Sequence, residues 1–170
     1  EIRLSLVGSE MCIRDRYRKV CIGEGCFGTN QKDKGGTEMN YFTIAELCKS
    51  DTADRLGIDN RCKKEHVVNM TALVDNVLDP LREAYGKPIR VNSGFRCPAL
   101  NKAVKGSVTS DHMTGRAADI TGGSPKENRR LFYLIQELGL PFDQLIDEKH
   151  FSWVHVSYRE GANRKQVLAL

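Results

Sequence analysis

The 170-residue sequence has no apolar run near the roughly 20 residues that cross a bilayer, so membrane insertion is not expected. Aromatic residues make up only 7% of the chain and are not interleaved with its scattered Lys and Arg, and the net charge is +4. This pattern argues against sequence-specific nucleic-acid binding. The first residues also lack the charged start, apolar stretch and cleavage site of a signal peptide, which predicts synthesis in the cytoplasm.

No two cysteines have the Cys-x-x-Cys spacing of a structural zinc knuckle. Six are present, at positions 12, 21, 26, 48, 62 and 97, and we expect most to be reduced, partly buried thiols. Cys21 and Cys26 lie close together in a Gly-rich stretch, but a lone pair is weak support for a metal site. A disulfide or an accidental pairing therefore remains open for them.

The length fits one globular domain with a core. Residues 1–38 show no sustained helical or strand period, and we interpret them as a disordered or partly artefactual leader outside the fold. Within them, residues 6–16 resemble the translation of a transposon end used in preparing sequencing libraries, and such a scar is excluded from fold reasoning. Residues 39–170 are predicted to form the folded domain, and a monomer is expected.

Regular patterns begin at Tyr41. Helices are predicted from a capping box at residues 43–46, over residues 66–85 with a bend or division at Pro80, over residues 99–104, and from Ser124 to Gly139. Strands are predicted at residues 88–92, 117–120, 142–147 and 153–157, the last two forming a hairpin, with a long loop over residues 106–114. The predicted fold class is α+β, with a small antiparallel sheet packed with helices.

Asp119 interrupts an apolar strand, where an ionised carboxylate is costly unless it is paired, hydrogen-bonded or metal-bound. His112 lies seven positions earlier in the loop, and His155 lies in another apolar strand. Two imidazoles and one carboxylate form the ligand set of a catalytic zinc site with one open position. Each residue alone also has a plainer explanation, as a hydrogen-bonded core histidine or a turn aspartate, and spacing does not show convergence.

Three motifs in order carry a family resemblance: Ser-Gly-Phe-Arg-Cys-Pro at residues 93–98, Ser-Asp-His-Met-Thr-Gly-Arg-Ala-Ala-Asp at 110–119, and Trp-Val-His at 153–155. Together they resemble the zinc D-alanyl-D-alanine carboxypeptidase family, which also includes phage endolysins, over roughly residues 41–158. The resemblance implies a zinc site on the sheet, with one ion held by His112, Asp119 and His155.

The same resemblance implies that Arg96 contacts a substrate carboxylate or carbonyl oxygen and stabilises an oxyanion. A surface salt bridge is the alternative role for this arginine. Ser110 and Trp153 are assigned to substrate binding, although core packing explains Trp153 equally well.

The sequence departs from the family pattern at the position of the general base. Many members carry an acidic residue three positions before the last histidine, where this chain has Ser152. A hairpin that pairs Glu148 with Trp153 places Glu148 on the same face as His155, diagonal to it. We therefore predict Glu148 as the base. Asp147 points to the opposite face in this register, and a one-residue slip would reverse the two assignments.

The function that follows is zinc-dependent hydrolysis of peptide bonds in peptidoglycan stem peptides or cross-links, of the D-Ala-D-Ala carboxypeptidase or L-Ala-D-Glu endopeptidase type. A cell-wall-binding module that keeps the metal without turnover is the alternative. A non-haem iron oxygenase fits less well, because its first histidine and carboxylate are usually two positions apart. A phage-type lysin released to the wall by a partner is simpler than a secreted enzyme that has lost its leader.

Overall fold

The computed structural model describes residues 41–170. The predicted leader at residues 1–38, with Cys12, Cys21 and Cys26, lies outside the described residues. The helical elements are α1 (Ile44–Cys48), α2 (Asp51–Leu56), α3 (Lys64–Leu73), η1 (Val74–Leu78), α4 (Asp79–Tyr85), α5 (Pro98–Ala103), η2 (Asp111–Thr114) and α6 (Pro125–Glu137). The strands are β1 (Arg90–Ser93), β2 (Ala117–Thr121), β3 (Gln144–Glu148), β4 (Trp153–Ser157) and β5 (Gln166–Ala169).

The predicted helix over residues 66–85 is confirmed as one helical run made of α3, η1 and α4. Its middle segment, η1, is π-helical and ends two residues before Pro80. Proline has no N–H and its ring crowds the carbonyl four residues earlier, so a widened turn there accommodates it. Pro80 therefore divides the helix without ending it, and Gly86 ends it in the left-handed conformation.

Local capping signals also form as the sequence predicts. The Thr43 hydroxyl accepts a hydrogen bond from the Glu46 backbone N–H at 3.1 Å. The Ser124 hydroxyl accepts one from the Glu127 N–H at 3.3 Å. Each bond satisfies a donor that the first turn of a helix leaves free, and so fixes where α1 and α6 begin.

The five strands form one sheet in the order β1-β2-β4-β3-β5. The α+β class is confirmed, and all neighbours are antiparallel except β3 and β5, which are parallel. The parallel edge strand was not predicted, because Gln166–Ala169 is short and mostly exposed and shows no clear alternation. Its position comes from tertiary hydrogen bonds, such as that from the Gln166 N–H to the Asp143 carbonyl at 2.9 Å.

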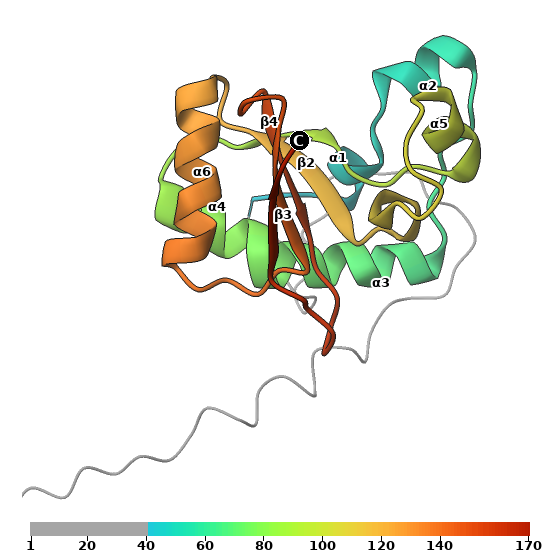
Figure 1. The fold of residues 1–170 in the computed structure, drawn as a ribbon. Coiled ribbons are helices and arrows are strands. Elements are labelled where there is room, and N and C mark those ends of the chain that lie inside the picture. Colours follow the sequence, from blue (N-terminus) through green and yellow to red (C-terminus); the bar gives the residue numbers. More distant parts are fainter. Residues whose placement is uncertain (1–40) are drawn as a thin grey trace, which may run out of the picture. The chain divides into compact units, whose positions relative to one another are not determined.

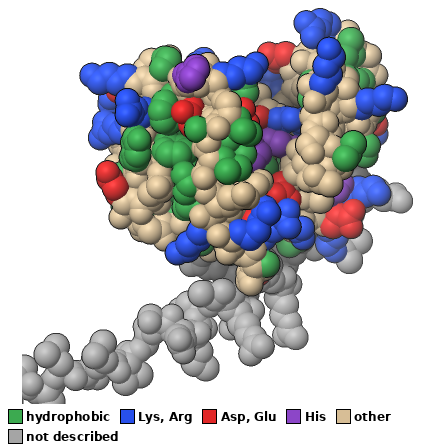
Figure 2. Space-filling model, viewed as in Figure 1, with side chains coloured by type: hydrophobic (Ala, Val, Ile, Leu, Met, Phe, Trp, Pro, Cys, Tyr) green, Lys and Arg blue, Asp and Glu red, His purple; other side chains and the backbone are tan. Residues whose placement is uncertain are grey.

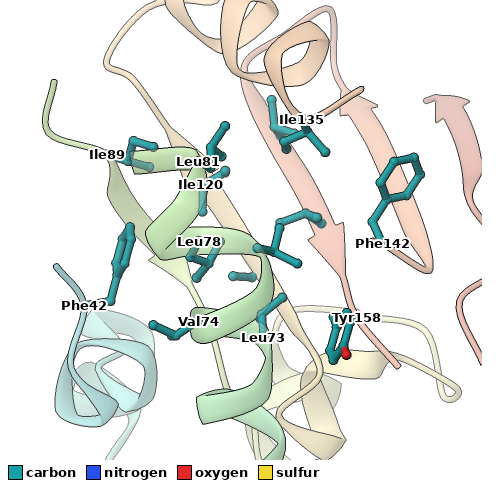
Figure 3. Packing of buried hydrophobic residues seen from close by; sticks show 14 of the residues in the cluster. Phe42, Leu73, Val74, Leu78, Leu81, Ile89, Ile120, Ile135, Phe142 and Tyr158 are labelled. Carbon is teal, nitrogen blue, oxygen red and sulfur yellow. The ribbon is translucent and has the colours of Figure 1, made fainter. Parts of the chain in front are cut away.

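Helices α4 and α6 lie on one side of the sheet, and α1, α2 and α5 lie on the other (Figure 1). Buried side chains of the helical run and of α6, such as Leu78, Leu81 and Ile135, pack toward Ile120 of β2 (Figure 3). Alternation along β2 then directs Asp119 away from this core, to the other face of the sheet. The core thus occupies one face and leaves the other face for polar residues.

Two features of composition can be located within residues 41–170. Cys48, Cys62 and Cys97 are free and half-buried. No helix in this part of the chain has both the length and the apolar character that crossing a bilayer requires.

A buried carboxylate, Asp143, ties the start of β3 to the segment that leads into β5. Its side chain is fully buried and accepts bonds from Arg164 Nε at 2.8 Å and Arg164 Nη2 at 2.6 Å. Arg159 Nε lies 3.2 Å from the same carboxylate. The hydrogen bonds from Arg164 lower the pKa of Asp143, outweighing the opposite effect of burial.

We predict that Asp143→Asn lowers the free energy of unfolding by about 2 kcal/mol at pH 7, because it removes charge-assisted hydrogen bonds. The folded-state pKa lies below the unfolded value of about 3.9, so this stability is fully present above pH 4 and is lost as the pH falls through the folded pKa. Urea unfolding of both proteins from pH 7 to pH 2.5 measures this. A difference that stays constant over that range would contradict the assignment.

Candidate metal centre and active site

One row of residues across the sheet forms the floor of the site. Asp119 of β2 pairs with His155 of β4, and Ile146 of β3 pairs with His155 from the other side. At the other end of the row, Ser93 of β1 pairs with Asp119. This last pairing depends on a bulge, because the register shifts between Val91 and Ser93. Directly opposed residues share a face, so the polar side chains of the row point the same way.

His112 comes to this row from η2, a turn of 3-10 helix where the sequence predicted a plain loop. Its ring Nδ1 lies 2.6 Å from the Gly94 carbonyl oxygen, and its own carbonyl accepts from the Arg96 N–H at 3.1 Å. Gly94 is needed there, because a Cβ at this position would lie 2.3 Å from the Leu47 carbonyl oxygen. The close approach of two backbone segments thus fixes the acceptor that orients the His112 ring.

His112, Asp119 and His155 converge, and all three are buried. His112 Nε2 lies 3.2 Å from both Asp119 Oδ1 and His155 Nδ1, and His155 Nδ1 lies 2.9 Å from Asp119 Oδ1. Figure 2 shows histidine, acidic and basic side chains together in a hollow of the surface.

The donor atoms of this cluster fit a divalent metal. A carbonyl can only accept, so His112 Nδ1 carries the hydrogen, and Nε2 of the neutral ring presents a lone pair to the cluster. Ligand atoms about 2.0–2.1 Å from a tetrahedral zinc ion lie about 3.3 Å apart, close to the separations found. A cation there would satisfy lone pairs that otherwise face one another.

Arg96 lies behind the carboxylate of this cluster. Its Nη2 donates to Asp119 Oδ2 at 2.5 Å, and its Nε donates to the Ser93 hydroxyl at 2.7 Å. The side chain is 15% exposed, so it is not the surface salt bridge that sequence reasoning left open. The bond occupies one oxygen of Asp119 and leaves Oδ1 facing the two histidines, as an outer-shell partner of a metal ligand does.

The electrostatics of Asp119 favour the carboxylate. Burial by itself would raise its pKa, but the electrostatic interactions and hydrogen bonds with His112 and His155 outweigh this and hold the pKa well below the usual range. Asp119 is therefore ionised in the folded protein, which is the state that coordinates a metal.

The predicted hairpin register is confirmed, because β3 and β4 pair Ile146 with His155 and Glu148 with Trp153. Glu148 and Trp153 therefore lie on the face of His155, one step along the sheet. Both are half-buried, and the Glu148 carboxylate has no hydrogen-bond or ion-pair partner among residues 41–170. Asp147 points to the other side, as predicted, and accepts a hydrogen bond from the Phe151 N–H.

The remaining predicted residues flank the cluster. Ser110 precedes η2 by one residue and makes no side-chain capping bond there. Trp153 has the Lys149 ammonium 5.3 Å from its ring centroid, so it lies at the edge of the site and outside the apolar core. Substrate binding by Ser110, Trp153 and Arg96 stays a prediction.

No role of their own was predicted for Ser93 and Gly94 from the sequence. Their functions depend on the bulge in β1 and on the approach of Leu47, which no local pattern shows. The only signal was their place in the motif of residues 93–98.

Comparison with known proteins agrees with this geometry. The family model described as Peptidase M15 matches residues 40–157, a span that includes the three clustered side chains. The chain belongs to the Peptidase M15 family. This confirms the resemblance that the three motifs indicated.

A curated protein of similar sequence is the zinc D-Ala-D-Ala carboxypeptidase of Streptomyces albus G, which is 38% identical over 96 residues. The aligned part makes up 55% of this chain and 35% of that protein, so the similarity spans about a third of the relative's length.

Proposed function

We propose that this chain is a zinc-dependent peptidase that hydrolyses peptide bonds in peptidoglycan stem peptides or cross-links. The observation that carries the proposal is the cluster of His112, Asp119 and His155, whose donor atoms lie 2.9–3.2 Å apart on one face of the sheet. Three protein ligands leave one position of a tetrahedral ion for water or substrate, as catalytic zinc sites do. Membership of a peptidase family and the name of the carboxypeptidase relative support the same reading.

A zinc ion bound at the cluster would lower the pKa of a bound water and polarise a peptide carbonyl. Glu148 is the group we assign as general base: its carboxylate shares the face of His155 and is free of partners among the described residues. It accepts the proton of the attacking water and then donates it to the leaving amine. Asp147 is unsuited to this task, because it points away and accepts the Phe151 N–H.

Arg96 holds Asp119 through one guanidinium nitrogen and Ser93 through another. Its charge lies beside the metal ligands, where it stabilises negative charge that develops on the substrate carbonyl oxygen. A cation at this position is also suited to the free carboxylates of stem peptides. Trp153 forms an apolar wall on the Glu148 side, and Ser110 lies at the His112 side.

The candidate bonds are D-Ala-D-Ala, as in the name of the relative, L-Ala-D-Glu, and a bond of the cross-link. A phage-type lysin that acts on the wall after release remains our prediction for its biological setting.

We expect the full chain with one equivalent of zinc to release new amine-bearing fragments from purified peptidoglycan, detected by mass spectrometry. Loss of a terminal D-Ala would establish the carboxypeptidase type, and a new N-terminal D-Glu would establish the endopeptidase type. Dialysis against a chelator should abolish the products, and zinc should restore them. No fragments from walls of several chemotypes, despite stoichiometric zinc, would favour a wall-binding module without turnover.

A further inference from the structure

The turn that joins β3 and β4 has an unfavourable backbone. Lys149, His150 and Phe151 all have positive φ, at 49°, 55° and 60°. L-residues rarely occupy this left-handed region, and three in succession without glycine persist only where the surroundings hold them. The turn lies directly between Glu148 and Trp153, the two residues that flank the metal cluster on this side.

A buried asparagine on α6 holds the turn. Asn128 is 1% exposed, and its Nδ2 donates to the carbonyl oxygens of Phe151 at 2.8 Å and Ser152 at 2.9 Å. Its Oδ1 accepts from the Thr121 hydroxyl at 2.9 Å and from the Gly122 N–H at 2.7 Å. The amide thus uses both of its N–H donors and both lone pairs of its oxygen.

These bonds lie where two strands of the site separate. The pairing of β2 with β4 ends at Ile120 and Val154. Beyond that pair, the Asn128 amide bridges the segment that follows β2 and the segment that precedes β4. β2 carries Asp119 and β4 carries His155, so the bridge joins the strands that supply two of the clustered ligands.

Other hydrogen bonds hold the turn to β3 and to the last residue of the chain: the Lys149 N–H donates to the Leu170 carbonyl at 2.7 Å, and the Ser152 N–H donates to the Glu148 carbonyl at 2.9 Å. Asp147 accepts the Phe151 N–H, and the Phe151 ring packs edge-on against Phe132 with centroids 5.5 Å apart. Only Asn128 connects the turn to the end of β2 through side-chain hydrogen bonds within the described residues. Its removal frees the carbonyls of Phe151 and Ser152, so that Lys149, His150 and Phe151 can relax toward ordinary φ values.

We infer that Asn128 is a positioning residue, which holds this turn so that the Glu148 carboxylate stays beside the metal cluster. The catalytic consequence rests on the proposed function, whereas the structural consequence does not. A carboxylate at the end of a strand moves with the turn that follows it, and a displacement of about 1 Å can cost a general base up to about a hundredfold in rate.

The first test needs no activity. Asn128→Asp keeps the size and the acceptor toward Thr121 and Gly122, but replaces the donor to Phe151 and Ser152 with an oxygen. Hydrogen exchange measured by mass spectrometry on the metal-free full chain should be at least about tenfold faster in residues 147–153 and unchanged in α5. Gln136→Ala, which removes a hydrogen bond within α6 itself, is the matched control and should leave the turn unchanged. Unchanged exchange at the turn in Asn128→Asp would overturn the inference.

The second test measures kinetics with bound zinc. Asn128→Asp and Asn128→Ala should lower kcat by about 10- to 100-fold, with KM and zinc stoichiometry unchanged. In a Glu148→Gln background the same substitutions should have no further effect, because Asn128 acts through Glu148. Equal losses in both backgrounds would show a merely structural role. If the parent protein cleaves no peptide, the proposed function fails, and the exchange experiment still decides whether Asn128 holds the turn.

Discussion

Replacement of His112 by alanine is expected to abolish both stoichiometric zinc binding and peptide hydrolysis. The substitution removes one of three converging donor atoms, and also the ring whose Nδ1–H donates to the Gly94 carbonyl. Loss of an outer-shell partner alone typically costs a metal site 10- to 100-fold in affinity, so the loss of a ligand should weaken zinc binding by more than about 100-fold. Hydrolysis should fall to the level of the chelated parent protein.

Zinc affinity is measured by competition with a chromophoric chelator, and thermal unfolding gives an independent readout. Zinc at a hundred times its dissociation constant should stabilise the parent by about 2.7 kcal/mol and leave His112→Ala nearly unchanged. His150→Ala is the control for zinc stoichiometry, because it removes an exposed imidazole from the hairpin turn. Stoichiometric, tight zinc in His112→Ala would exclude this cluster as the metal site.

Glu148→Gln should keep zinc and lose turnover. The amide has nearly the same shape as the carboxylate but cannot accept a proton, so kcat should fall by about 10²–10⁴-fold, the range that positioned acid–base groups contribute. KM should change little, because Glu148 is not among the three clustered donor residues. The measurement is a steady-state assay on a defined stem peptide, with zinc content determined on the same samples.

Asp147→Asn is the matched control for this experiment, because it changes the neighbouring carboxylate on the opposite face of β3. It should reduce stability by weakening the bond from the Phe151 N–H, and should affect kcat less than Glu148→Gln does. The reverse result, a larger loss in Asp147→Asn, would assign the base to Asp147. Full hydrolysis in Glu148→Gln would exclude Glu148 and leave the base to be sought elsewhere in the site.

The sequence by itself determined the local parts of this protein. Helices are specified by the hydroxyl caps at Thr43 and Ser124 and by the apolar spacing of residues 66–85. These signals join residues three or four positions apart, so they can be identified from the sequence alone. Alternation likewise indicated the β3–β4 register that the structure has, because a one-residue slip would turn the buried face of each strand outward. Asp119 was conspicuous as a carboxylate between apolar residues.

Only the tertiary structure decided which distant residues these side chains contact. His112 and His155 are 43 positions apart, and Asp119 and His155 are 36 apart, so their convergence depends on the pairing of β2 with β4 and on the contact of His112 with Gly94. The bond of Arg96 to Asp119 and the placement of β5 have the same origin. Local periodicity reports which face of an element is buried. It carries no information about which distant segment covers that face, because this is settled by packing among all the elements at once.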